Sequence, residues 1–215
     1  SGTAQEVKIE IPAGTFASTV TVAVARKTDA TEKPKADKQP NLNGTGVIIE
    51  ITVPVQPVKT VTLTVAFSNA EVTGMNKNNL ALARYNSTRG EWELLPSTVD
   101  TVNNKITATT TQFSKFQIVE KVPLSVVDKV FTYPNPYYVS KGGGINFARL
   151  PKDAEITIYT ITGEKVFEAT ETDNDGYYNW DLKNSDGDTV ASGVYIWIVK
   201  DTDGNKKIGK LAIIR

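Results

Sequence analysis

The sequence predicts an all-β protein that consists of two tandem antiparallel β-sandwich domains. Large apolar side chains alternate with Thr or Ala in many short runs, such as 20–24 and 61–65, and this period of two is typical of strands with one buried face. Asp-Gly and Thr-Gly pairs separate several of the runs and favour hairpin turns. Apolar runs with helical period are rare, so pairs of packed sheets are the expected architecture.

The domain boundary is expected near residue 121. The chain has 215 residues, which is enough for two domains of about 100 residues each. The segment 120–124 follows the last alternating run of the first half and contains Pro123, which favours an extended connection. We therefore place the first domain at 1–121 and the second at 122–215. The two halves do not resemble each other, so no repeat array is indicated.

The strands of the first domain are expected where period two is flanked by turn residues. The second and third of them enclose the polar segment 27–43, which has little to bury and is expected to be a mobile surface loop. The expected strands span 6–11, 19–26, 46–53, 60–67, 80–85, 92–95, 105–109 and 116–119.

The second domain shows the same alternating runs, and the turns between them are easier to recognise in the sequence. Glycine accepts the positive φ that two-residue hairpin loops require, and it occurs in Thr162-Gly163, Asn174-Asp175-Gly176, Asp186-Gly187 and Asp203-Gly204. The expected strands span 144–150, 155–161, 164–169, 177–181, 194–200 and 206–214.

Composition excludes several classes of function. Lys plus Arg and Asp plus Glu number 24 each, so no net field attracts nucleic acid or anionic lipid. No run approaches the ~18 apolar residues that span a bilayer, so membrane insertion is not expected. Cysteine and histidine are absent, which removes disulfides, thiolate metal sites and the usual general base. We therefore expect the chain not to be an enzyme.

Five ordered pieces of the second half carry a family resemblance. They are Tyr133-Pro134-Asn135-Pro136, the run 156–163, Asn179-Trp180-Asp181, Ala191-Ser192-Gly193-Val194-Tyr195 and the final strand 210–215. Together they resemble the C-terminal immunoglobulin-like (Ig-like) module of secreted bacterial proteins, the type related to the flagellar hook-capping Ig-like domain and to type IX secretion sorting domains. The connection from Trp180 to Gly193 follows the longer, hook-capping pattern rather than the shorter type IX pattern.

The resemblance implies roles for particular residues and for the chain. Trp180, Asp181, Gly193 and Tyr195 are the signature residues, and Trp180 and Tyr195 are expected to be large buried anchors. Such modules export or attach a larger protein. The expectation is a non-catalytic C-terminal region of a larger secreted or cell-surface bacterial protein that serves export, attachment or spacing. The partners so implied are the upstream domains and the secretion machinery or cell envelope, with a monomeric chain and an extracellular or cell-surface location.

The first half resembles a ZU5-like bacterial surface β-sandwich. The resemblance rests on the opening 9–15, which reads Ile-Glu-Ile-Pro-Ala-Gly-Thr, and on 111–116 near the last strand. In some ZU5-like proteins the matching place reads His-Phe-Ser, and the chain cleaves itself before the Ser. Gln112 stands in place of that His, so no imidazole can take the proton of Ser114. We expect the pair Phe113 and Phe116 to pin the last strand to the core; the alternative is a self-processing module that breaks the chain between Phe113 and Ser114.

The alternative function is a carbohydrate-binding accessory region of a secreted polysaccharide-active enzyme. Exposed aromatic rings can stack on sugar faces, and Tyr137, Tyr138 and Tyr178 are the candidates. Alternation along a strand allows only one of Tyr137 and Tyr138 to face outward, and it places Tyr178 on the same face as Trp180.

Calcium is the one cofactor that the sequence leaves open; no other is expected. Hard cations prefer several carboxylate and carbonyl oxygens from short loops, and two arrangements offer them. Asp201 and Asp203 begin a segment like a calcium loop, although no Glu closes it and a plain Asp-Gly hairpin turn explains it without a metal. Asp173, Asp175, Asp186 and Asp188 would form a second cluster if their two loops meet at one end of the sandwich.

Overall fold

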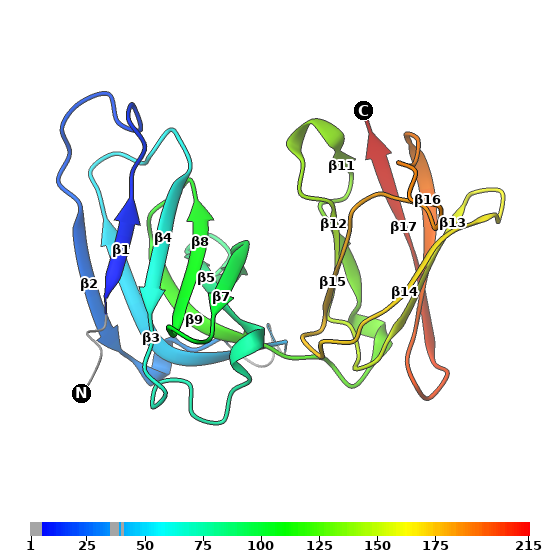
Figure 1. Cartoon of the computed structure of the whole chain (residues 1–215), viewed down its shortest axis with the longest axis horizontal. Coiled ribbons are helices and arrows are strands. Elements are labelled where there is room, and N and C mark those ends of the chain that lie inside the picture. The colour runs from blue at the N-terminus through cyan, green and yellow to red at the C-terminus, as the bar shows by residue number, and fades with distance from the viewer. Residues whose placement is uncertain (1–5, 35–38, 40) are drawn as a thin grey trace. The chain divides into compact units, whose positions relative to one another are not determined.

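The computed structural model describes residues 6–34, 39 and 41–215. The chain divides into two compact units, Ser1–Lys121 and Val122–Arg215, which we call the first and the second domain. Each domain is a sandwich of two β-sheets, so the predicted all-β fold class is confirmed (Figure 1). Helical structure among the described residues is limited to short 3-10 turns.

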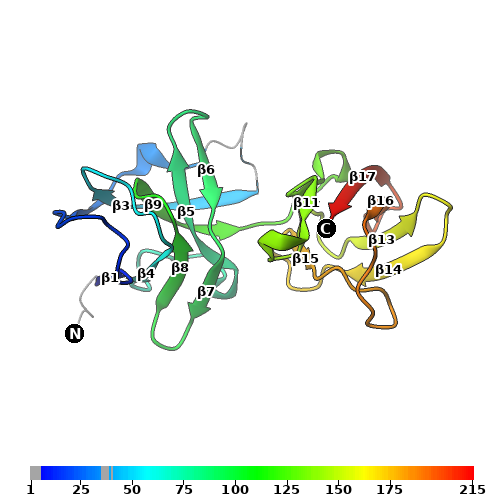
Figure 2. The ribbon, with the colours of Figure 1, turned by 90° about the horizontal axis from the view of Figure 1, so that it is seen from above.

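The first domain packs a four-stranded sheet against a five-stranded one. Its strands are β1 (Val7–Glu10), β2 (Ala23–Thr28), β3 (Leu42–Thr52), β4 (Val61–Ala66), β5 (Leu80–Asn86), β6 (Glu91–Leu94), β7 (Ser97–Asp100), β8 (Lys105–Thr110) and β9 (Lys115–Lys121), with 3-10 turns η1 (Ala30–Glu32) and η2 (Lys77–Asn79). The sheet orders are β1-β4-β8-β7 and β2-β3-β9-β5-β6, and neighbouring strands in both sheets are antiparallel. Figure 2 shows the two layers from above.

Alternation along the strands builds the main core of the first domain. In β4, Val61, Leu63 and Val65 are buried between the sheets, and the Thr residues between them lie on the outer face. There the hydroxyls of Thr64 and Thr107 are 3.1 Å apart on neighbouring strands. The pattern that predicted these strands therefore also determines which side of each sheet faces the core.

The outer face of the five-stranded sheet is also apolar, and this corrects the prediction for 27–43. A second cluster on this face contains Ile48, Trp92 and Val119. Gln39 is buried beside it: its side-chain oxygen accepts a hydrogen bond from Trp92 N at 2.8 Å, and its amide donates to Trp92 O. The segment thus includes η1, the start of β3 and a buried amide. Residues 35–38 and 40, where the expected mobility also falls, lie outside the described residues.

A nearly buried ion pair adds a pH-dependent contribution to the first domain. Arg26 Nη2 lies 2.9 Å from Glu71 Oε1, and both side chains are about nine-tenths buried. Glu71 Oε2 also accepts a hydrogen bond from Ser68 N at 2.7 Å. Burial alone would raise the pKa of Glu71, but the Ser68 N–H and the Arg26 guanidinium hold this pKa below its ordinary value of 4.5.

We expect the first domain to lose stability on acidification through Glu71. Because the native pKa is depressed, the stabilisation is fully present above the ordinary pKa and is lost as pH falls through the native pKa. Hydrogen exchange of β2 and β4 amides at pH 7 and at a pH below 4.5 should show this loss. A Glu71→Gln variant should be less stable at pH 7 and should lose less on acidification. An equal loss in both proteins would contradict the assignment.

The second domain packs a three-stranded sheet against a five-stranded one. Its strands are β10 (Phe131–Tyr133), β11 (Tyr137–Tyr138), β12 (Ile145–Ala148), β13 (Glu155–Thr160), β14 (Lys165–Thr170), β15 (Tyr177–Trp180), β16 (Gly193–Lys200) and β17 (Lys206–Ile214), with 3-10 turns η3 (Val127–Lys129) and η4 (Val139–Lys141). The sheet orders are β10-β12-β15 and β11-β17-β16-β13-β14.

The pairing of β11 with β17 in the second domain departs from the antiparallel prediction. The two-residue strand β11 pairs in parallel with the end of β17, so that Tyr137 lies opposite Ile213. Just before β11, the side chain of Asn135 forms two hydrogen bonds with the same edge of β17. Its Nδ2 donates to Lys210 O at 2.9 Å, and its Oδ1 accepts from Ala212 N at 3.1 Å. The side-chain amide of Asn135 therefore extends this pairing along β17 to the residues before the start of β11.

Candidate functional site

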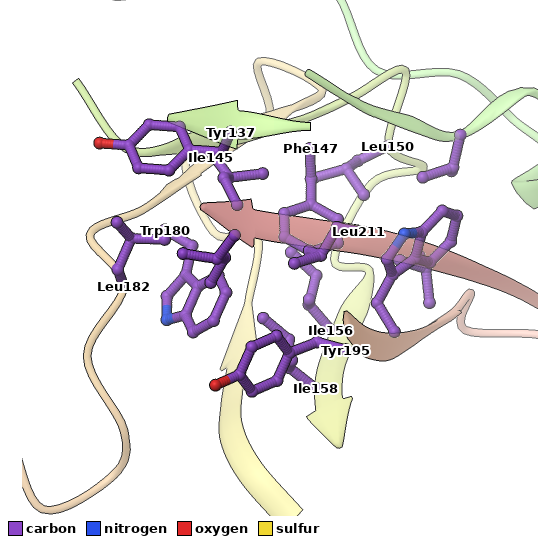
Figure 3. Packing of buried hydrophobic residues seen from close by; sticks show 14 of the residues in the cluster. Tyr137, Ile145, Phe147, Leu150, Ile156, Ile158, Trp180, Leu182, Tyr195 and Leu211 are labelled. Atoms are coloured by element: carbon purple, nitrogen blue, oxygen red, sulfur yellow. The ribbon is translucent and has the colours of Figure 1, made fainter. Parts of the chain in front are cut away.

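Two of the four signature residues form the centre of the second core, as the resemblance implies. Trp180 is fully buried, and its ring centroid lies 6.2 Å from that of Tyr195 and 5.9 Å from that of Phe167. Figure 3 shows Trp180 and Tyr195 beside Ile158 inside the sandwich. Both polar ends are satisfied, because Trp180 Nε1 donates to Lys183 O and Tyr195 Oη donates to Ala191 O, each at 2.8 Å. These rings hold the two sheets together and offer no surface for chemistry.

The other two signature residues lie at the ends of the long connection between β15 and β16. Asp181 Oδ1 accepts a hydrogen bond from Lys183 N at 3.1 Å and so fixes the turn that follows Trp180. Gly193 begins β16, where an added Cβ would meet only the Tyr195 ring at 3.8 Å. Nothing in the structure requires glycine at this position. The connection is itself anchored, because Leu182 and Val190 are buried and joined by a backbone hydrogen bond.

The three tyrosines proposed for sugar stacking do not form one platform. Tyr138 is 45% exposed, but Tyr137 is 2% exposed, because its strand directs it into the core. Tyr137 therefore has no free ring face, which corrects its assignment as a sugar-binding residue. Tyr178 shares the inner face with Trp180 and is half-buried, with its ring centroid 6.1 Å from that of Phe167.

Sequence reasoning missed an exposed ring pair on β10. Phe131 and Tyr133 are stacked with centroids 5.6 Å apart, and both are more than a third exposed. The guanidinium carbon of Arg149 lies 5.4 Å from the Phe131 centroid. The alternation of Phe, Thr and Tyr at 131–133 is the signal that could have identified this short strand.

Asp201 belongs to a self-contained hairpin turn. Its Oδ1 accepts hydrogen bonds from the backbone N–H groups of Asp203 and Asn205, and its Oδ2 accepts one from the Asn205 amide. Asp203 is exposed. In the described part of the chain, neither residue joins a group of three or more acidic side chains whose oxygens lie close together.

Asp186 and Asp188 also belong to a local turn, which is held by Asn184. Their backbone N–H groups donate to Asn184 Oδ1 at 3.0 and 2.8 Å, and both side chains are exposed. The described residues do not bring them into a common cluster with Asp173 and Asp175. The predicted four-residue cluster is therefore wrong in including Asp186 and Asp188.

A different acidic group forms around Asp173 and Asp175. Their carboxylates and that of Glu171 place one oxygen each within 4.8 Å of one another. Glu171 is 1% exposed and Asp175 is 4% exposed, whereas Asp173 is exposed. Burial raises the pKa of Glu171, and the neighbouring Asp173 carboxyl raises it further. This group, which we call the β14–β15 acidic site, is the best-formed candidate for a ligand site.

The place that resembles a self-cleavage site is occupied by structural contacts. Phe113 is buried in the main core of the first domain, and its N–H donates to Gln56 Oε1 at 2.7 Å. Ser114 Oγ donates to Tyr85 O at 3.1 Å, and Gln112 Oε1 accepts from Arg84. The Ser114 hydroxyl proton is thus directed to a backbone carbonyl, which cannot act as a base.

Comparisons with known proteins give partial matches. No protein-family model and no curated protein matches the chain. PorZ of Porphyromonas gingivalis, described as an essential bacterial surface component of the type IX secretion system, is 25% identical with a TM-score of 0.39 over 66% of this chain and 16% of PorZ. Dimeric latent PorU of the same organism is 15% identical with a TM-score of 0.29, over 74% of this chain and 18% of PorU.

The chain spans less than a fifth of the length of each matched structure. Both TM-scores are low, so these matches do not assign a function to the chain. Among the described residues, no helix has the length and hydropathy that crossing a membrane requires.

Proposed function

We propose that this chain is a non-catalytic two-domain region of a larger secreted or cell-surface bacterial protein, and that its second domain serves export or attachment. One observation carries the proposal. Apolar side chains lie on the solvent side of the five-stranded sheet in the second domain, where the alternation of a water-soluble sandwich would place polar ones. These side chains, which we call the β16–β17 face, are Tyr138, Val194, Ile208 and Ile214, each 40% to 57% exposed.

The strand register places these side chains on one face. Val194 lies opposite Ala212, two residues before Ile214, and Tyr138 lies opposite Ile214 on the other side of β17. In β16 the intervening residues point inward, among them the buried Tyr195. Clustered exposed apolar side chains mark interaction surfaces more often than isolated ones do. Exposed lysines, Lys206 and Lys210, flank Ile208 on β17.

The β16–β17 face also agrees with the signature resemblance. Trp180 and Tyr195 are used inside the core, so a partner would recognise the folded surface rather than the signature residues themselves. Residues 206–214 form a strand within the sheet, so they are presented as part of that surface. Attachment through a preformed face requires no reacting group, in agreement with the lack of histidine and cysteine.

Deleting residues 130–215 from the gene of the parent protein tests the proposal. Fractionation should find that the parent no longer reaches or stays at the cell surface. Full export and surface retention after the deletion would refute the proposed role.

Point variants distinguish a loss of the β16–β17 face from a loss of the fold. Val194→Glu combined with Ile208→Glu should reduce surface attachment to the level of the deletion, because charges replace the apolar contacts. Ile161→Glu is the matched control, since Ile161 is 69% exposed in the turn after β13 and should attach as the unchanged protein does. All variants should melt as the unchanged protein does. Normal attachment of the double variant would exclude this face.

A further inference from the structure

The loop between β14 and β15 holds one carboxylate in a fixed position inside the protein. Glu171 directly follows β14, and its N–H donates to Ala154 O at 2.9 Å. Its Oε1 accepts hydrogen bonds from Asp175 N at 2.7 Å and Gly176 N at 3.3 Å. The loop therefore wraps around this side chain and positions the second oxygen, Oε2.

That second oxygen is buried without a partner. Glu171 Oε2 has no hydrogen-bond partner among the described residues, although the side chain is only 1% exposed. A buried carboxylate oxygen without a donor is unfavourable and uncommon in native proteins. The carboxylates of Asp173 and Asp175 lie close to Glu171, and in their ionised forms they repel it unless a cation lies between them. The arrangement is thus incomplete as a set of protein groups alone.

The spacing of the oxygens suits one ion of the size of calcium. Ca²⁺ binds oxygen ligands at about 2.3–2.6 Å, so two ligands on opposite sides of one ion are about 5 Å apart. The three carboxylates place their ligand atoms within 4.8 Å of one another. Mg²⁺ requires shorter distances and near-ideal octahedral geometry, which fits less well. Asp173 is exposed, so the ion and its remaining water ligands can reach the site.

We propose that Glu171, Asp173 and Asp175 bind one Ca²⁺ ion. Glu171 Oε2 and the Asp173 carboxylate are the principal ligands, and the Asp175 carboxylate is the third. The Oδ1 atom of Asp175 accepts a hydrogen bond from Tyr177 N at 2.7 Å, which ties the ion to the start of β15. The ion links the end of β14, in the five-stranded sheet, to β15, in the three-stranded sheet. Bound Ca²⁺ therefore cross-links the two layers of the second domain.

Calcium titration of the whole chain tests the site. Chelator-treated protein should bind CaCl₂ in calorimetry with one site and a dissociation constant of about 10⁻⁴–10⁻³ M, as extracellular modules do, and its melting temperature should rise with CaCl₂. Terbium should bind there with luminescence sensitised by Tyr177, which lies two residues after Asp175. No binding at about ten times that concentration would overturn the proposal.

Two variants and a control assign the ligands. Asp173→Asn removes an exposed carboxylate and should weaken Ca²⁺ binding at least about tenfold. Glu171→Gln should also abolish the calcium response, yet it should raise the melting temperature without calcium, because the amide N–H can donate to Asp173. Asp203→Asn removes an exposed carboxylate from the other hairpin and should leave binding unchanged. Unchanged affinity in Asp173→Asn, or an equal loss in Asp203→Asn, would contradict the assignment.

Discussion

Replacing Trp180 by alanine is expected to lower the free energy of unfolding of the second domain by about 3–5 kcal/mol, which is typical of deleting a large buried aromatic side chain. The indole is fully buried between the sheets, with Phe167 and Tyr195 beside it. The substitution also leaves Lys183 O without its indole donor. Because a domain of this size has about 5–15 kcal/mol of stability in total, much of the folded population would be lost at moderate temperature.

Equilibrium unfolding in urea measures this effect. Hydrogen exchange of the β13 and β16 amides assigns it to the second domain. Tyr138→Ala is the matched aromatic control: its ring is 45% exposed, so the change should stay within about 0.5 kcal/mol. A loss below about 1 kcal/mol in Trp180→Ala would mean that the core tolerates a cavity there, against the usual cost of such truncations.

Replacing Gly209 by alanine is expected to destabilise the same domain by about 1–3 kcal/mol through overpacking. Gly209 lies opposite Trp197 on the neighbouring strand, and the indole covers it. A Cβ at Gly209 would lie 2.1 Å from Trp197 Cζ2 and 2.4 Å from Cε2. The ring cannot simply move aside, because Trp197 is 3% exposed and packs edge-on against Phe147 at 5.8 Å.

Two comparisons isolate this clash. Gly193→Ala places a methyl group in the same sheet, where its nearest contact is 3.8 Å away, and should be nearly neutral. In a Trp197→Leu background, Gly209→Ala should cost clearly less, because the ring that it meets is gone and the two positions are coupled. Equal cost in both backgrounds, measured by urea unfolding, would show that the clash is not the cause.

Local periodicity predicted the fold class and most strands, but not the elements that depend on distant partners. β10 and β11 are three and two residues long and flank Pro134 and Pro136, so any alternation in them is too short to stand out from a loop. Alternation required that one of Tyr137 and Tyr138 point inward. Only the pairing of β11 with the end of β17, which is distant in sequence, determines that it is Tyr137. The burial of Gln39 likewise depends on Trp92 in another strand.

The candidate calcium site was likewise predictable only in part from local sequence. Asp173 and Asp175 stand out because they lie in a short loop with a Gly turn. Glu171 was missed because a Glu after a strand usually faces water, and only its burial beneath the loop distinguishes it. Asp186 and Asp188 have the same composition signal, but their turn is organised around Asn184. Residue type identifies possible ligands, whereas loop packing decides which of them converge.

The two hydrogen bonds of Asn135 block part of the β17 edge against pairing with another strand. An unpaired strand edge can recruit the edge of another chain and extend the sheet from molecule to molecule. Here the donor and the acceptor that an incoming strand would need, Ala212 N and Lys210 O, are already taken by one side-chain amide. A second copy would have to break both bonds before its strand could pair with Lys210 and Ala212, so this part of the β17 edge does not extend the sheet from one molecule to the next.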